Sequence, residues 1–451
     1  MNRKFVLAAV VSAIVAYTAF WEGCFGACSC ITDSVYYMRF AERMLGNGVD
    51  DGWFATWPVG YPAVLAAIRG VTGLDVFVAS KLVGVGMCIA LLAMFWKFAR
   101  GAFAILALGL VNLAFLKIWR STLSEQCFIP AMVLLGFVIA GGADGSRLKR
   151  ISVWAILFVT VFLFRYVGVF APIWAVGALL FTFIMGRLAG VEKLDVRNVR
   201  WLADVSLAGC IAWCFEGGYL ILNRLHTGCL TGMERVELGK EAESLIINMV
   251  AAYGREIQIF IILAFWVLLL WLLARKSLGC GHVAGCLGKG TPLPMLEDQR
   301  LFFFVGMGVM YYLTMGALST VGNFNELGFR LLYPGTIMVV IGISLAVAKW
   351  LDVGGWLDSL SSLRFSAYLL VLFVAGCNLL SGELVVRRIL GISVYDIGEP
   401  YHQKKLELIE KYGAEKAGSR ICIKGLGDPD FFIGCLRPDL FIEFPKGCNR
   451  Y

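Results

Sequence analysis

A few charged side chains stand out in this sequence because they border or interrupt long apolar runs. Asp33 follows the first apolar run, Glu125 opens another, and Arg165 and Arg330 each stand directly beside one. A carboxylate in such a place can accept a proton from a hydroxyl or an amine. An arginine can neutralise a phosphate through two parallel hydrogen bonds. These residue types therefore favour proton abstraction next to a bound anion.

Each of these residues also has a purely structural interpretation. Asp33 is a good N-cap for a helix that begins at residue 33 or 34. Glu125 can form an ion pair with Arg120 or Lys117, which lie just before it. Any of the arginines can anchor a helix end by keeping its charged head in water. A carboxylate at membrane depth is nevertheless costly, and that cost makes a functional role the default hypothesis for Glu125.

Aromatic side chains accompany the first acid. They lie in "DSVYYMRFAERMLGNG" (33–48) and in "WFATWPVGYP" (53–62). Tyrosine and tryptophan are common at membrane interfaces, and they also stack on sugars or on isoprenoid chains. The candidate substrate-binding side chains are Tyr36, Tyr37, Trp57, Tyr61, Glu125 and Glu326.

The composition shows what kind of scaffold must position these groups. The chain has 451 residues, of which 59% are hydrophobic and 16% charged, and its mean hydropathy is +0.77. So much apolar surface requires a bilayer, and helices satisfy their own backbone groups there. The sequence predicts an all-α polytopic membrane protein with about eleven spans. We expect them at 4–22, 76–96, 101–117, 122–141, 151–164, 166–186, 202–222, 246–274, 301–321, 331–350 and 366–383.

The loops indicate the orientation of these spans. Lys and Arg gather in alternate loops, such as 145–150 and 186–200, as expected for the cytoplasmic side. The N-terminus is then cytoplasmic, the first span is retained rather than cleaved as a signal, and the C-terminus is extracytoplasmic. The net charge of +8 follows this topology and does not indicate nucleic-acid binding, because no basic stripe with interleaved aromatics is present.

Two further parts are expected outside the membrane. The first outer loop, 23–75, contains an amphipathic helix near 33–44 with Tyr37, Phe40, Ala41 and Met44 on its apolar face and Arg39, Glu42 and Arg43 toward water. The segment 58–73 predicts a second surface helix. We expect residues 1–383 to form the membrane domain. Residues 384–451 predict a small α/β outer segment, with a helix near 400–416 and short strands in "RICIKG", "DFFIGCL" and "LFIEFP".

These motifs together resemble the bacterial GT-C-fold glycosyltransferases, which take sugars from polyprenyl-phosphate carriers, and their protein mannosyltransferase and aminoarabinose transferase branches. The resemblance is carried, in order, by "DSVYYMRFAERMLGNG", "WPVGYPAVLAAI", "STLSEQCF" (121–128), "FRYVGVF" (164–170) and "FRLLYPG" (329–335). It covers residues 1–175 and, more loosely, 300–350. The family's second acid is replaced here by Ser34.

The resemblance implies a hexosyl- or pentosyltransferase in a bacterial inner membrane, with a polyprenyl-phosphate sugar donor and a glycan, lipid or protein acceptor. It implies Asp33 as the general base, and Glu125, Arg165 and Arg330 fall where the family keeps its own. We expect Lys117 and Arg120 to bind the donor phosphate together with Arg165 and Arg330. A single carboxylate without a covalent intermediate predicts inversion at the anomeric carbon. No cofactor is required, although some GT-C enzymes use a divalent metal. With only three histidines in the chain, a histidine metal site is disfavoured.

Two other classes of function compete with this interpretation. A transporter or flippase for a lipid-linked substrate also uses charged residues near its spans, but it places them near the midplane and often in repeated halves. Here the charges gather at the predicted outer boundary, and no internal repeat is evident. A non-catalytic scaffold would leave the ordered motifs unexplained.

Overall fold

The structure is a computed structural model, and it describes residues 32–47, 57–100, 102–103, 106–107, 110, 115, 118–119, 122–141, 146–188, 196–231, 299–321, 329–353, 407, 410–415, 420–422 and 441–443. Within these ranges the elements are α2 (Thr32–Met44), α3 (Gly60–Thr72), α4 (Val76–Phe98), α7 (Glu125–Gly141), α8 (Arg147–Phe164), the 3₁₀ helix η1 (Tyr166–Phe170), α9 (Ala171–Leu188), α10 (Val196–Thr227), α13 (Gln299–Val321), α14 (Phe329–Val353), β1 (Arg420–Cys422) and β2 (Phe441–Glu443).

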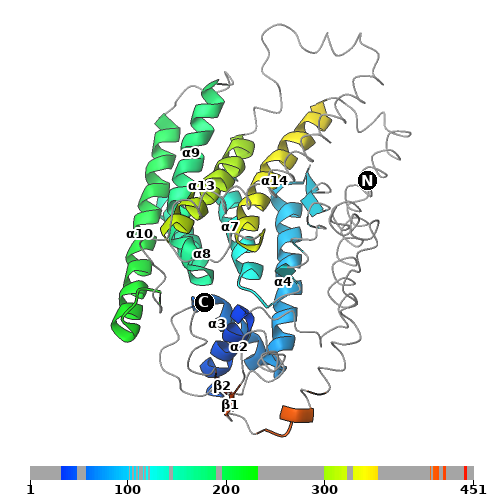
Figure 1. Cartoon of the computed structure of the whole chain (residues 1–451). Helices are drawn as coiled ribbons and strands as arrows, with labels where there is room; N and C mark the ends of the chain where they lie inside the picture. Colours follow the sequence, from blue (N-terminus) through cyan, green and yellow to red (C-terminus); the bar gives the residue numbers. More distant parts are fainter. Residues whose placement is uncertain are drawn as a thin grey trace, which may run out of the picture.

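Long apolar helices dominate the described chain and run side by side, with α2 and α3 at one end of them (Figure 1). Four helical stretches are long and apolar enough to cross a membrane, namely Val76–Phe98, Tyr166–Arg187, Val199–Thr227 and Arg300–Leu318. Two shorter apolar stretches are Glu125–Gly141 and Arg330–Ala346. The protein is therefore a helical, multi-pass membrane protein.

Several predicted spans coincide with these helices, and the rest cannot be compared. The predictions at 76–96, 122–141, 151–164, 166–186, 202–222, 301–321 and 331–350 each overlap one described helix or, at 166–186, η1 and α9 together. The predicted spans 4–22, 246–274 and 366–383 lie outside the described residues, and 101–117 is described only at isolated positions. The total of eleven spans, the orientation of the termini and the division at residue 383 stay predictions.

One core joins most of the helices. Its largest fully buried side chains include Trp119, Trp154 and Trp174, together with several phenylalanines of α4, α7, α8 and α13. Small residues allow the closest helix contacts. A Cβ atom on Gly308 of α13 would lie 2.7 Å from the carbonyl oxygen of Gly335 in α14, so glycine is required there. This close packing holds the start of α14 against α13.

The helices α2 and α3 form a second, smaller cluster with the start of α4. Its buried members include Tyr37, Met38 and Ala41 of α2 and Tyr61 of α3. Tyr412, one of the described residues within the predicted helix 400–416, is buried in the same cluster. Part of the C-terminal segment therefore packs against the helices that carry the first motif.

Two of the three predicted strands contain a described strand. β1 and β2 pair in parallel, with Ile421 opposite Ile442. The segment "DFFIGCL" lies outside the described residues. The α/β character of the whole C-terminal segment therefore stays a prediction.

Candidate active site

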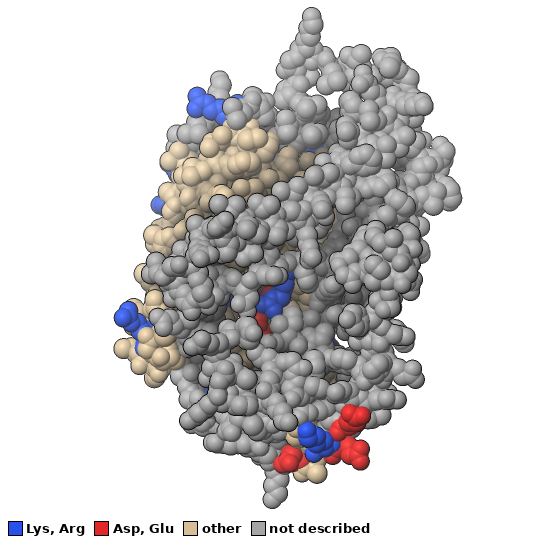
Figure 2. Space-filling view, in the orientation of Figure 1, with Lys and Arg blue, Asp and Glu red and all other residues tan. Residues whose placement is uncertain are grey.

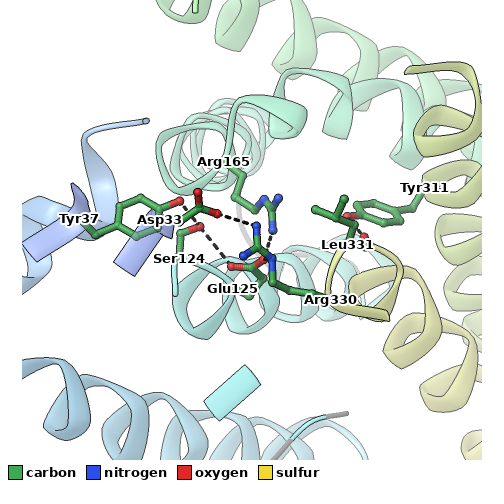
Figure 3. Close-up of polar contacts among 8 residues, drawn as sticks. All are labelled: Asp33, Tyr37, Ser124, Glu125, Arg165, Tyr311, Arg330 and Leu331. Atoms are coloured by element: carbon green, nitrogen blue, oxygen red, sulfur yellow. Dashed lines mark hydrogen bonds and ion pairs between the residues drawn. The ribbon is translucent and has the colours of Figure 1, made fainter. Parts of the chain in front are cut away.

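Four charged side chains from distant parts of the chain meet at one place (Figure 3). Arg330 lies between the two acids: its Nη2 donates to Asp33 Oδ2 at 2.6 Å, and its Nε lies 3.0 Å from Glu125 Oε1. Arg165 forms an ion pair with the same Glu125 oxygen. Two carboxylates and two guanidinium groups thus form one connected cluster, which we call the charge cluster.

The two acids of the charge cluster differ in their exposure to water. The Glu125 side chain is only 1% exposed, whereas that of Asp33 is 26% exposed. Arg165 and Arg330 lie between these extremes, at 17% and 22%. Water therefore has access to the Asp33 side of the cluster, while the Glu125 side is closed by protein.

Local sequence explains how each group of the charge cluster is held. Glu125 is the first residue of α7, where the helix dipole favours a negative charge. Arg165 has an extended backbone (φ −152°, ψ 134°) between α8 and η1. The chain folds back so tightly there that a Cβ atom on Gly168 would lie 2.6 Å from the carbonyl oxygen of Val161. Glycine at 168 therefore lets η1 turn and place Arg165 beside Glu125.

Arg165 is kept charged by its surroundings. Burial alone would lower the pKa of Arg165, but the adjacent Glu125 carboxylate opposes this, and the pKa lies above the ordinary value of arginine. Its guanidinium also lies 5.8 Å from the centre of the Phe128 ring, one turn along α7. Arg165 is thus a fixed cation at every pH at which the protein is folded.

Arg330 is positioned by the first turn of α14. The hydroxyl of Tyr311 in α13 donates to the carbonyl oxygen of Leu331 at 2.7 Å (Figure 3). Tyr311 is itself fixed by an edge-to-face contact with Trp174, at 5.0 Å between ring centres. Pro334 lacks a backbone N–H, so the carbonyl of Arg330 has no ordinary helical partner. Tyr311 therefore ties the first turn of α14, which carries Arg330, to α13.

A second chain of contacts ties α2 to the loop before α7. The Tyr37 hydroxyl donates to Ser124 Oγ at 2.9 Å, and Ser124 Oγ in turn lies 3.5 Å from Glu125 Oε2. Burial raises the pKa of Tyr37, so its hydroxyl keeps the proton that it donates. Asp33 stands one helical turn before Tyr37. The position of the carboxylate of Asp33 is thus linked to the segment that carries Glu125.

The predicted aromatic residues gather beside this link. Tyr36 and Trp57 stack with 4.4 Å between ring centres, and Tyr37 contacts Tyr61 edge-to-face at 5.2 Å. The Tyr61 hydroxyl donates to Gln126 Oε1 at 3.0 Å. Tyr36 and Trp57 are partly exposed, whereas Tyr37 and Tyr61 are buried. Tyr36 and Trp57 therefore offer the accessible aromatic surface, and the two buried rings support it.

The structure corrects the predicted faces of the first surface helix. Glu42 was expected to point to water, yet it is 2% exposed, and its Oε1 lies 3.1 Å from Nε of Arg69 in α3. The reason is that α3 packs against α2, so that the buried side of α2 faces protein. The buried face includes Tyr37, Met38, Ala41 and Glu42.

The structural interpretations of the acids also differ from what is observed. The described hydrogen bond of the Asp33 carboxylate goes to Arg330, which lies 297 positions away, and not to the start of its own helix. Glu125 pairs with Arg165 and Arg330, and not only with a neighbour in sequence. Lys117, Arg120 and Glu326 lie outside the described residues, so their predicted roles stay predictions.

Sequence reasoning missed Tyr311 and Gln126 as supports of the site. Tyr311 lies in a segment that reads only as an apolar span, and Gln126 lies in the motif "STLSEQCF", where only the adjacent Glu125 attracted attention. Among the described residues, no group of three or more His, Cys, Asp or Glu side chains is arranged to hold a metal ion. In the space-filling view, Lys or Arg and Asp or Glu side chains are visible side by side near the middle of the face (Figure 2).

Comparison with known proteins identifies the fold. No protein-family model matches the chain, and no curated protein matches its sequence. ArnT from Cupriavidus metallidurans bound to undecaprenyl phosphate is similar in structure, with a TM-score of 0.53 and 11% identity over 97% of this chain and 85% of that one. ArnT from the same organism in the apo state gives a TM-score of 0.50 and 13% identity over 91% and 69%. Because ArnT is an aminoarabinose transferase of the GT-C type, the chain has the GT-C fold, as the sequence motifs predicted.

Proposed function

We propose that this protein is a glycosyltransferase that moves a sugar from a polyprenyl-phosphate carrier to an acceptor outside the cytoplasm. The observation that carries the proposal is the charge cluster, which brings the carboxylate of Asp33 together with the guanidinium groups of Arg165 and Arg330. The GT-C fold supports it, because the ArnT structure of the same fold holds undecaprenyl phosphate. The motifs in the sequence point to the same class of reaction.

The chemistry requires little more than these groups. The bond between the anomeric carbon and the phosphate oxygen of the donor already has a good leaving group. Asp33 accepts the proton of the acceptor's hydroxyl or amine as that atom attacks the anomeric carbon. Arg165 and Arg330 stabilise the negative charge of the departing polyprenyl phosphate. One displacement inverts the anomeric configuration.

The neighbouring aromatic side chains fit the remaining parts of the substrates. Tyr36 lies in α2, three residues after Asp33, and it stacks on Trp57, which precedes α3; both rings are partly exposed. An aromatic face binds the apolar side of a sugar ring or an isoprenoid unit. We assign this pair to substrate binding, and we keep Lys117 and Arg120 as predicted ligands of the donor phosphate.

The place of the charge cluster favours transfer over transport. Glu125 opens α7, Arg165 follows the last residue of α8, and Arg330 lies in the first turn of α14. The cluster thus gathers at the ends of apolar helices, where the head group of a lipid carrier lies. A transporter site is expected near the middle of the spans.

The direct test compares two variants that make the same chemical change. We expect Asp33→Asn to abolish sugar transfer in cells, measured by mass spectrometry of cell-envelope glycans and polyprenyl-phosphate sugars. Asp75→Asn is the matched control, because Asp75 caps α4 by accepting from the backbone N–H of Phe77, and asparagine caps equally well. Envelope glycans that are identical with and without the protein would refute the proposal. Unchanged transfer in Asp33→Asn would remove Asp33 as the base.

A further inference from the structure

We infer that the donor phosphate binds by exchange: it takes Arg330 away from Asp33, while Glu125 keeps both arginines in place. This inference rests on the proposed function and adds an order of events to it. The base is masked by an ion pair until the lipid phosphate arrives. Glu125 is then a positioning residue and not a ligand of the substrate.

The first argument is the charge of the cluster. Two carboxylates and two guanidinium groups cancel, and every guanidinium already has a carboxylate partner. A phosphate that entered beside this arrangement would meet two acids together with two arginines. One carboxylate must therefore release its arginine before the phosphate can make full contact with that arginine. Only one of the two acids is free to do so.

The second argument is the difference in burial between the acids. Glu125 is 1% exposed and would be left as an unpaired buried charge if it lost its arginines, which is costly. Asp33 is 26% exposed, so water can replace Arg330 around its carboxylate. The contact between Arg330 and Asp33 is thus the one that opens. Arg330 keeps its Nε on Glu125 and turns its outer nitrogen, Nη2, from the base to the phosphate.

The third argument is the movement of charge during transfer. The acceptor O–H or N–H proton goes to Asp33, the acceptor atom bonds to the anomeric carbon, and the bond to the phosphate oxygen breaks with its electron pair on the phosphate. The carboxylate thereby loses one negative charge, and the phosphate changes from a singly charged diester into a monoester of about −1.5 to −2. A guanidinium that has moved from Asp33 to the phosphate follows that charge and stabilises the transition state more than the ground state.

The test measures binding of undecaprenyl phosphate to purified full-length protein in detergent. Because Asp33 competes for Arg330, we expect Asp33→Asn to bind this lipid at least tenfold more tightly than the unchanged protein, although it transfers no sugar. Asp75→Asn, which removes one surface carboxylate away from the charge cluster, is expected to change the affinity less than twofold. Glu125→Gln removes the same charge as Asp33→Asn but releases the anchor, so we expect unchanged or weaker binding.

A double variant shows whether Arg330 is the group released. In an Arg330→Ala background, Asp33→Asn is expected to change the affinity less than twofold. An equal gain in both backgrounds would mean that only overall charge matters, and it would overturn the exchange. Unchanged or weaker binding in Asp33→Asn alone would overturn it as well. If neither the unchanged protein nor any folded variant binds undecaprenyl phosphate, the proposed function fails first and the exchange fails with it.

Discussion

Replacement of Glu125 by glutamine tests whether the charge cluster depends on its buried acid. Glutamine keeps the shape of the side chain but removes the charge that faces Arg165 and Arg330. At an effective dielectric constant of about 20, a unit ion pair 3–4 Å apart gains about 4–5.5 kcal/mol before desolvation. Loss of one partner from a buried pair costs about 3–5 kcal/mol. The two arginines are partly exposed, so water offsets part of the loss, and we expect about 3 kcal/mol of destabilisation.

Glu42→Gln is the matched control for this experiment. Glu42 is as buried as Glu125, at 2% exposed, but it lies outside the charge cluster: Arg69, which pairs with it, is 27% exposed, and Asn47 donates to its other oxygen at 3.3 Å. We expect that variant to lose about 1.5 kcal/mol. Thermal unfolding in detergent, followed by tryptophan fluorescence, ranks the variants against the unchanged protein. If Glu125→Gln unfolds no earlier than Glu42→Gln, the buried acid does not hold the charge cluster together.

Two further substitutions probe the supports of the site and of the core. Tyr311→Phe removes the hydrogen bond to the Leu331 carbonyl, and a loss of about 1 kcal/mol there should weaken undecaprenyl phosphate binding several-fold. Tyr312 is the next residue of α13, and Tyr312→Phe loses a hydroxyl contact with Thr336 of α14, so this variant should leave binding unchanged. Equal effects of the two substitutions on binding would show that Tyr311 does not position Arg330. Glu216→Leu should raise the unfolding temperature. Both carboxylate oxygens of Glu216 are buried with no hydrogen-bond partner in the described part of the chain, and leucine removes that cost. A lower unfolding temperature in this variant would contradict the prediction.

The described membrane helices could be predicted because length and hydropathy alone specify them. The predicted span 202–222 lies wholly within α10, and 331–350 lies within α14. The ends were predicted less well. α10 begins at Val196, inside the segment 186–200 that we predicted to be a charged cytoplasmic loop. Charged residues such as Lys, Arg and Glu favour a helix about as much as apolar ones, so a helix can continue beyond the hydrocarbon. Hydropathy marks the part of a helix in lipid and not the whole helix.

That the site residues meet was also accessible from the sequence. The alternation of basic loops placed Asp33, Glu125, Arg165 and Arg330 on one predicted side, and the structure brings these four together. Their pairing was not accessible, because a hydropathy pattern does not fix how each helix is rotated about its axis. Nothing in the sequence indicated that Arg330 would bridge two acids that lie 92 residues apart.

The misassigned face of α2 shows why the position of the base depends on more than its own helix. A helix that only lay on a membrane would place Glu42 in water and would leave Asp33 free to move with the surface. Instead, Glu42 is held by Arg69 of α3, and the Tyr37 hydroxyl is bonded to Ser124, next to Glu125. Both contacts fix the rotation of α2. The buried anchor, the bridging arginine and the base are therefore parts of one rigid arrangement, in which only the exposed contact between Arg330 and Asp33 can open without leaving a buried charge unpaired.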